Sequence, residues 1–153
     1  MEHRKLCYIT FKGGGFMKNK IIILVIFTLS VAVVSAFVTF NNFFPKAPEI
    51  NFPKTEEIVS GSVSFKNEEK EIEKENLTSI ASEIEKSLAT RRQSINDSPD
   101  VRPYYALNVS TAERYYCFYI YEYAGGIYIE LPYEGIYLSD IRVMEFVSAY
   151  FTE

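Results

Sequence analysis

Histidine, cysteine and tryptophan are nearly absent from this sequence, whose 153 residues include one histidine, two cysteines and no tryptophan. The histidine is His3, close to the N-terminus, so the rest of the chain has no imidazole base for a Ser/His or Cys/His nucleophile. A zinc site needs several Cys or His ligands, which this composition does not supply. We therefore predict that the protein is not an enzyme and has no catalytic residue, metal site or cofactor.

The sequence also predicts neither a disulfide bond nor a glycine-rich phosphate-binding loop. Cys7 and Cys117 lie on opposite sides of a long apolar stretch, so they are not expected to meet. Cys117 stands in an aromatic run, where a buried and unreactive thiol is expected. Residues 13–15 are glycines, but they do not lie between a strand and a helix as the phosphate-binding loop of a nucleotide site does.

Basic side chains are few in the larger, C-terminal part of the chain. From Lys46 onward the sequence has 11 Lys and Arg residues against 19 Asp and Glu residues, which gives a net charge of −8. Binding to phosphates needs clustered cations, so no nucleic acid partner is expected. The charge run from Glu68 to Glu75 is predicted to be a solvated helix face, because repeated Glu without His or Asp is a poor metal-ligand set.

Charged side chains are missing altogether from Ile21 to Pro45, where the sequence is mostly apolar. A helix needs about 20 residues to cross the ~30 Å hydrocarbon layer of a membrane, and Ile21–Phe40 supplies that length. Lys18 and Lys20 precede the span, and basic flanks stay on the cytoplasmic side. We predict a single-pass protein of the cell membrane, with a cytoplasmic N-terminus and a C-terminal domain outside the cell.

A cleaved signal peptide is the alternative to this anchor. Val34, Ser35 and Ala36 have the small or acceptable side chains that a signal peptidase requires, so cleavage after Ala36 would release a secreted protein. The apolar run continues as far as Phe44, which favours an uncleaved anchor. We place the transmembrane helix or signal peptide at residues 21–41.

Residues 1–16 look foreign to the rest of the chain. Met17 is followed by basic residues and then by the apolar run, which is a complete membrane-targeting start in itself. The Lys and Gly residues at 12–15 correspond to purine-rich codons, as a translated ribosome-binding site would. We predict that Met17 is the true start, that residues 1–16 are a leader from an over-extended gene start, and that residues 17–20 are a short cytoplasmic stub.

The part that follows the apolar run divides into a linker and a domain. Residues 42–54 contain Pro45, Pro48 and Pro53 and show little periodicity, so we predict a proline-rich, mobile linker. The folded extracytoplasmic domain is expected to occupy residues 55–153.

Hydrophobic periodicity predicts the elements of this domain. A period of two residues indicates strands at 59–65, 104–110, 114–123, 127–131 and 136–138, with a tight hairpin at 124–126. Helical spacing indicates one helix from Glu68 to Arg92, after an N-cap at Asn67, and a final helix after a cap at Ser139. In the first helix, the side chains expected to be buried are those of Ile80, Ile84 and Leu88, and Glu83 is expected on the solvent face.

The predicted fold class is α+β, in the order β-α-β-β-β-α. A mainly antiparallel sheet of four or more strands is expected to have two helices on one face and to follow a single transmembrane helix.

Tyrosine is concentrated in the predicted sheet, since eleven of the twelve tyrosines fall between Tyr104 and Tyr150. Alternation along residues 115–123 places aromatic rings on both faces of one strand. One face must pack on the helices, and the other has apolar rings with polar tips, as binding surfaces do. The alternative is that this second face is covered by the linker or a second helix, or that tyrosine only fills the strand.

Two segments, 90–99 (TRRQSINDSP) and 128–137 (YIELPYEGIY), together resemble a family of small extracytoplasmic domains of Gram-positive Firmicute bacteria. That family is a domain of unknown function. The resemblance extends from about Phe52 to Tyr150 and implies a domain that follows a signal or anchor segment. It implies no activity.

The same two segments supply the candidate binding residues Arg91, Arg92, Tyr133 and Tyr137. If they lie at one end of the sheet, they are predicted to line a small cleft for an anionic or carboxylate-bearing group, since arginine forks suit such partners. The alternative is that the arginines cap the helix end and bind Asp97 or Asp100 while the tyrosines pack beneath them.

The function that these observations favour is a non-enzymatic, membrane-anchored binding module outside the cell. Its partner would be a protein, a peptide or a glycan of the cell wall. The alternative is a hydrolase or transferase that acts on wall material through carboxylates such as Glu130 and Glu134.

Overall fold

The computed structural model describes residues 14–152, with side chains from Lys20 onward. Residues 1–13 of the predicted leader lie outside the described residues, so the start at Met17 stays a prediction. The chain divides into two compact units, Met1–Phe44 and Pro45–Glu153, which are described separately.

The first unit contains one long helix, α1 (Gly14–Phe43). Its span Lys20–Phe43 is 24 residues long and apolar enough to cross a membrane, a property that signal sequences share. At 1.5 Å per residue this is about 36 Å. Inside the span, the hydroxyls of Thr28 and Ser30 donate to the backbone oxygens of Val25 and Phe27. These polar side chains therefore find their partners within the helix, which is what a membrane span would need.

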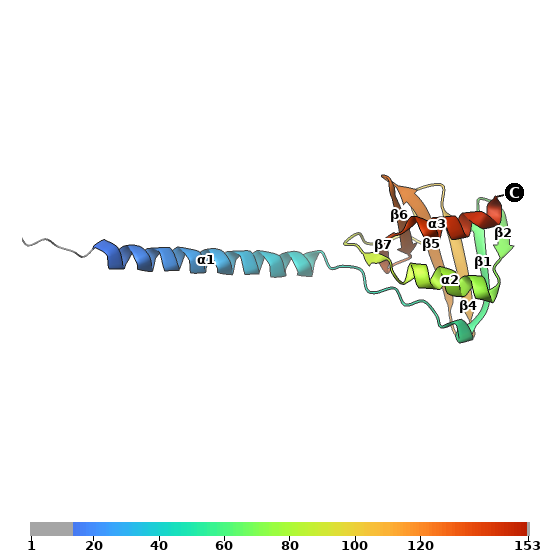
Figure 1. Ribbon diagram of the computed structural model, residues 1–153, viewed down its shortest axis with the longest axis horizontal. Helices are drawn as coiled ribbons and strands as arrows, with labels where there is room; N and C mark the ends of the chain where they lie inside the picture. Colours follow the sequence, from blue (N-terminus) through green and yellow to red (C-terminus); the bar gives the residue numbers. More distant parts are fainter. Residues whose placement is uncertain (1–13, 153) are drawn as a thin grey trace, which may run out of the picture. The chain divides into compact units, whose positions relative to one another are not determined.

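The second unit is built on an antiparallel sheet with the strand order β2-β1-β4-β5-β6-β7-β3 (Figure 1). All neighbouring strands in it are antiparallel. The seven strands are β1 (Ile58–Phe65), β2 (Glu68–Glu71), β3 (Leu88–Ala89), β4 (Tyr105–Thr111), β5 (Tyr115–Tyr123), β6 (Gly126–Leu131) and β7 (Gly135–Ser139).

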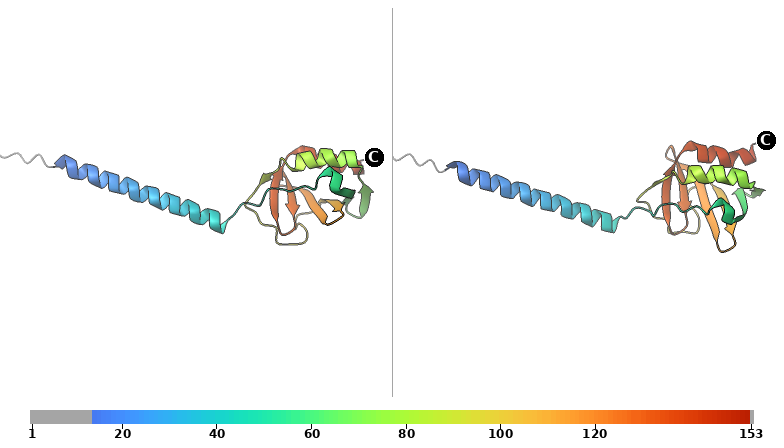
Figure 2. Two further views of the ribbon diagram at one scale, coloured as in Figure 1. Left: turned by 90° about the horizontal axis from the view of Figure 1, so that it is seen from below. Right: turned by 60° about the horizontal axis from the view of Figure 1, so that its bottom comes forward.

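Two helices, α2 (Lys74–Ile84) and α3 (Ile141–Ser148), cover one face of this sheet (Figures 1 and 2). Ile80 and Ile84 of α2 and Val143 and Val147 of α3 are fully buried in the core that the helices form with the sheet. The predicted α+β class, with two helices on one face of an antiparallel sheet, is confirmed.

Close packing between α2 and the sheet explains the glycine in β1. A Cβ atom on Gly61 would lie 2.4 Å from Cδ1 of Leu77, which is buried on α2. Leu77 therefore occupies the space that a side chain at position 61 would need.

The prediction of one helix from Glu68 to Arg92 is wrong at both ends. Glu68–Glu71 is β2, an edge strand that pairs with β1 after a turn in which Lys66 has a φ of 55°. The helix α2 begins only at Lys74 and ends at Ile84. Leu88 belongs to the edge strand β3 and is 67% exposed, although the sequence predicts it to be buried. Both errors fall on edge strands. All four residues of β2 are charged, and the partner of β3 is β7, which is distant from it in sequence.

The turn between β5 and β6 has the backbone conformation of a tight hairpin. Ala124 and Gly125 both have positive φ, 50° and 77°, so the predicted tight hairpin is confirmed.

The N-cap of α3 is Asp140 and not Ser139, because Oδ1 of Asp140 accepts a hydrogen bond from the Arg142 backbone nitrogen at 3.0 Å. That bond lowers the pKa of the Asp140 carboxyl below its ordinary value.

The stretch predicted as a mobile linker is largely part of the domain. Phe52 is only 5% exposed, and its ring stacks on that of Phe118 with the centroids 5.0 Å apart. The backbone nitrogen of Ala47 donates to the Thr90 oxygen at 2.9 Å. The compact unit therefore begins at Pro45, and the predicted boundary at residue 55 is wrong.

Candidate functional site

The sheet has a second face, turned away from α2 and α3, which we call the open face. Alternation along the strands places on it the side chains that neighbour the buried core residues in sequence. One part of this face is covered by the loop 91–104, and the other part is exposed.

The covered part contains a buried carboxylate. Glu130 on β6 accepts hydrogen bonds from Oγ of Ser94 at 2.7 Å and from the Tyr121 hydroxyl at 3.1 Å. All three residues are buried. Burial, together with the nearby Glu130, raises the pKa of Tyr121 well above its ordinary range, so its hydroxyl keeps the proton that it donates. Both oxygens of Glu130 are thus engaged, one by Ser94 of the loop and the other by Tyr121 of the neighbouring strand β5.

Aromatic contacts extend this cover along the face. The guanidinium of Arg92 lies 5.0 Å from the ring centroid of Tyr123 and 5.6 Å from that of Tyr128. At the other end of the loop, the ring of Tyr104 meets that of Tyr119 edge-on at 5.1 Å. Part of the predicted tyrosine face is therefore covered, but by the loop 91–104 and not by the linker or a second helix.

The two segments that were predicted to form a cleft are in contact. The backbone nitrogen of Ile136 donates to the Arg92 oxygen at 3.2 Å. Tyr133 has a φ of 62°, is 67% exposed, and donates its hydroxyl to Oδ1 of Asp97 at 2.6 Å. The loop and the turn thus lie side by side, as the cleft hypothesis requires.

The four predicted side chains do not face one space, however. Tyr137 is fully buried in the core, so its ring cannot touch a ligand at the surface. Arg92 stacks on rings of the open face, and Tyr133 is engaged with Asp97. The inclusion of Tyr137 in the cleft is therefore wrong, and a binding role for Arg91, Arg92 and Tyr133 stays a prediction.

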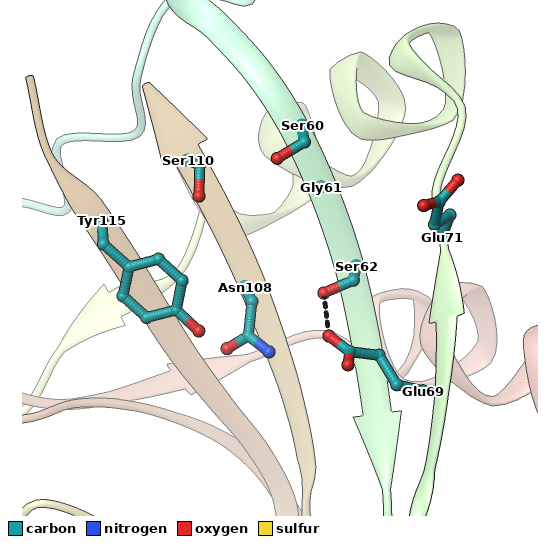
Figure 3. A pocket seen from close by; sticks show the side chains of 8 residues that line it. All are labelled: Ser60, Gly61, Ser62, Glu69, Glu71, Asn108, Ser110 and Tyr115. Atoms are coloured by element: carbon teal, nitrogen blue, oxygen red, sulfur yellow. Dashed lines mark hydrogen bonds between the residues drawn. The ribbon is translucent and has the colours of Figure 1, made fainter. Parts of the chain in front are cut away.

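The exposed part of the open face contains a polar hollow that the sequence analysis missed (Figure 3). We call it the trough; its volume is about 470 Å³. Its floor is formed by small residues of β1 and β4, and its walls by longer side chains of β2 and β5. The lining residues are Ser60, Gly61, Ser62, Glu69, Glu71, Asn108, Ser110 and Tyr115.

The strand register explains this arrangement. Ser62 lies between Glu71 on β2 and Asn108 on β4, and Ser110 lies between Ser60 on β1 and Tyr115 on β5. From β2 to β5 there are three strand spacings, so the two walls are roughly 14 Å apart at the backbone. Short side chains between two long ones create a hollow. The only signal in the sequence is the alternation of serines at 60, 62 and 64 within the predicted strand 59–65, and this pattern indicates a polar strand face without indicating a hollow.

Most polar groups of the trough are free to bind a ligand. Oγ of Ser62 donates to Oε1 of Glu69 at 2.6 Å, which is the bond drawn in Figure 3. Within residues 20–152, no hydrogen bond or ion pair engages the other polar side chains, which are those of Ser60, Glu71, Asn108, Ser110 and Tyr115. Hydroxyl, amide and carboxylate groups therefore face the same space with their bonding capacity unused.

The electrostatic character of the trough is negative. Two carboxylates line it, and no Lys or Arg is among the lining residues. Burial, then Cys117 and Glu69, raise the pKa of Tyr115, so its hydroxyl stays protonated and can both donate and accept. Tyr115 is 65% exposed, so one face of its ring is available to a ligand.

Cys117 lies beside the trough on the same face of β5. It is partly buried, and burial raises the pKa of its thiol, which lowers its thiolate fraction at neutral pH. In the part of the chain with described side chains, no group of three His, Cys, Asp or Glu residues is placed to hold a metal ion.

Comparison with known proteins places this domain among relatives of unknown function. The family described as "Domain of unknown function (DUF5300)" matches residues 46–138, which include the trough and the loop 91–104. A solved structure, "NMR structure of the protein from Ruminococcus gnavus", is similar with a TM-score of 0.51 and 33% sequence identity. The match covers 60% of this chain and 90% of that one. No curated protein matches.

The Ruminococcus match also bears on how the domain folds. Because the matched part makes up 90% of that chain, a related domain folds with almost nothing attached to it. In the present chain, the unit Pro45–Glu153 has its own core. A fragment of residues 46–153 is therefore a suitable protein for the measurements below.

Proposed function

This chain belongs to the family described as "Domain of unknown function (DUF5300)", and we propose that it is a non-enzymatic module that binds a linear saccharide chain in the trough. The observation that carries the proposal is the set of unengaged polar side chains that meet around one hollow of the sheet. Saccharides offer hydroxyls that both donate and accept, which is what serine, asparagine and protonated tyrosine side chains match.

The shape of the trough favours a saccharide over a peptide. Its floor is Ser, Asn and Gly, so it offers no apolar pocket in which a peptide side chain would be held. The exposed ring of Tyr115 offers a flat apolar surface at one wall, against which the C–H face of a sugar ring can pack. The two walls stand on strands whose backbones are roughly 14 Å apart, and the hollow between them follows the strand direction, as a linear chain would.

We also propose that α1 anchors the domain to the outer side of the membrane, where the partner would be a glycan of the cell wall. Two features support this placement, namely the length of the apolar span and the basic residues Lys18 and Lys20 before it.

This orientation predicts an outcome for intact cells. With a tag after Glu153, a protease added outside is expected to remove the tag from intact cells, and the tagged protein is expected in the membrane fraction. Recovery of the tagged domain from the medium would instead show cleavage near Ala36. A tag that is digested only after the cells are broken would contradict the proposed orientation.

Binding to saccharide predicts effects for single substitutions in the trough. In sedimentation with insoluble wall polysaccharide, Tyr115→Ala and Asn108→Ala are each expected to weaken binding of fragment 46–153 about tenfold, which corresponds to ~1.4 kcal/mol. The reason is the loss of the ring surface at one wall or of the amide on the floor.

Tyr133→Ala is the matched control, because Tyr133 is 67% exposed and Tyr115 is 65% exposed. It is expected to leave binding unchanged, since Tyr133 is outside the trough. If Tyr133→Ala abolished binding and Tyr115→Ala did not, the ligand would occupy the loop and turn predicted from the sequence.

A further inference from the structure

We infer that the saccharide bound in the trough carries primary amino groups, and that these bind as ammonium ions at Glu69 and Glu71. The inference rests on the proposed function and adds the charge of the ligand to it. It follows from the geometry of the β2 wall, from the lining charges and from the unengaged oxygens.

The β2 wall presents two carboxylates on one side of a strand. Glu69 and Glu71 are two residues apart, so both side chains lie on the open face, about 7 Å apart along the strand. Lys70, between them, pairs with Val63 of the helix-covered face and points the other way. The cation nearest in sequence therefore does not neutralise the wall.

The oxygens of these carboxylates remain available. Only Oε1 of Glu69 is engaged, by the hydroxyl of Ser62. Carboxylates accept hydrogen bonds and donate none, so the ligand must supply donors along this wall. Sugar hydroxyls can do so, but bonds from an ammonium to a carboxylate are charge-assisted and roughly twice as strong as neutral ones.

Charge complementarity also excludes the opposite class of ligand. A polymer of phosphates or uronic acids would bring negative charge to a hollow with two carboxylates and no lining cation. Such a polymer would be repelled by this wall and by the domain as a whole, whose net charge from Lys46 onward is −8.

The remaining groups of the trough distinguish this ligand from a simple cation. A bare metal ion would leave Asn108, Ser110 and Tyr115 without a role, because they stand on the floor and the far wall, up to roughly 14 Å from β2. A saccharide with amino groups uses both walls, since its ammonium groups meet the carboxylates while its ring and hydroxyls reach the serines, the amide and the tyrosine.

Two oligosaccharides of equal length test the inference. Fragment 46–153 is titrated with a glucosamine oligomer, which is cationic below neutral pH, and with an N-acetylglucosamine oligomer, which is neutral. At low salt and mildly acidic pH, the glucosamine oligomer is expected to bind at least tenfold more tightly. The advantage is expected to shrink as salt is added or as the pH is raised until the amines are neutral.

The double variant Glu69→Gln/Glu71→Gln is expected to remove the advantage of the glucosamine oligomer. The matched control is Glu68→Gln, which removes a charge from the same strand but pairs with Phe65 and lies on the other face. It is expected to keep most of the advantage. Thermal melts of the parent and both variants are expected to show that each is folded, because the changes are at exposed positions of an edge strand.

Each other outcome has a distinct meaning. Equal binding of the two oligomers, unchanged in the double variant, would overturn the inference and leave saccharide binding intact. A trilysine peptide that bound as tightly as the glucosamine oligomer would overturn it too, because the wall would then be a non-specific cation surface. If neither oligomer and no wall polysaccharide bound, the proposed function itself would fail.

Discussion

Ile84→Asp is expected to lower the free energy of unfolding of fragment 46–153 by about 3–5 kcal/mol, because it buries a carboxylate in an apolar core. Ile84 is 0% exposed and belongs to the cluster that joins α2 and α3 to the sheet. Denaturant melts followed by circular dichroism measure the change. An Ile84→Asp protein that melted like the parent would show that α2 does not pack on the sheet in solution.

The control for this substitution is Ser79→Asp, which introduces the same side chain at an exposed position of the same helix. It is expected to change stability by less than about 0.5 kcal/mol. Glu83, predicted from the sequence to be solvent-exposed, is unsuitable. Its side chain is only 11% exposed and lies 2.7 Å from Lys86 Nζ and 3.2 Å from Nη2 of Arg142 on α3. Glu83→Ala would therefore remove an ion pair between the two helices.

Phe52→Ala is expected to destabilise the same fragment by about 3–5 kcal/mol, the usual cost of removing a buried aromatic ring. The ring fills a place beside Phe118 in the core, although its segment was predicted to be a mobile linker. Asn51→Ala, at an exposed neighbouring position, is expected to have an effect below about 0.5 kcal/mol.

A shorter fragment gives a second measure of the same contact. A protein that begins at Thr55 lacks Phe52 and also Ala47 and Ile50, which pack against the core. It is expected to melt at a lower denaturant concentration than fragment 46–153. If both fragments and Phe52→Ala all unfolded at one midpoint, the segment would be the mobile linker that its prolines suggested.

The strands were predicted well where the alternation of side chains is strong. In β4, β5 and β6, apolar residues recur every second position, because one face of each strand packs on the helices. The same argument predicted Ile80 and Ile84 correctly, since a helix that packs on one side repeats its apolar residues every three or four positions.

The elements that were missed have no such local pattern. Glu68–Glu71 is entirely charged, and it is a strand only because β1 offers hydrogen bonds to its backbone. Phe52 lies in a proline-rich segment. It belongs to the core because its ring stacks on that of Phe118, which is distant from it in sequence. The predicted cleft was wrong for the same reason. It placed Arg92 and Tyr137 together, but the local sequence does not show that Tyr137 faces the core.

The sequence by itself determined the apolar span, the acidic character of the domain, the α+β class and the shortage of side chains for nucleophile and zinc chemistry. These are properties of composition and of short-range periodicity, which do not depend on how distant segments meet. The trough was decided only by the tertiary structure. Ser62, Glu71, Asn108 and Tyr115 lie on four strands whose order in the sheet is β2-β1-β4-β5. That order results from backbone pairing between segments as far apart in sequence as Ile58 and Thr111, and no local pattern specifies which side chains it brings to one hollow.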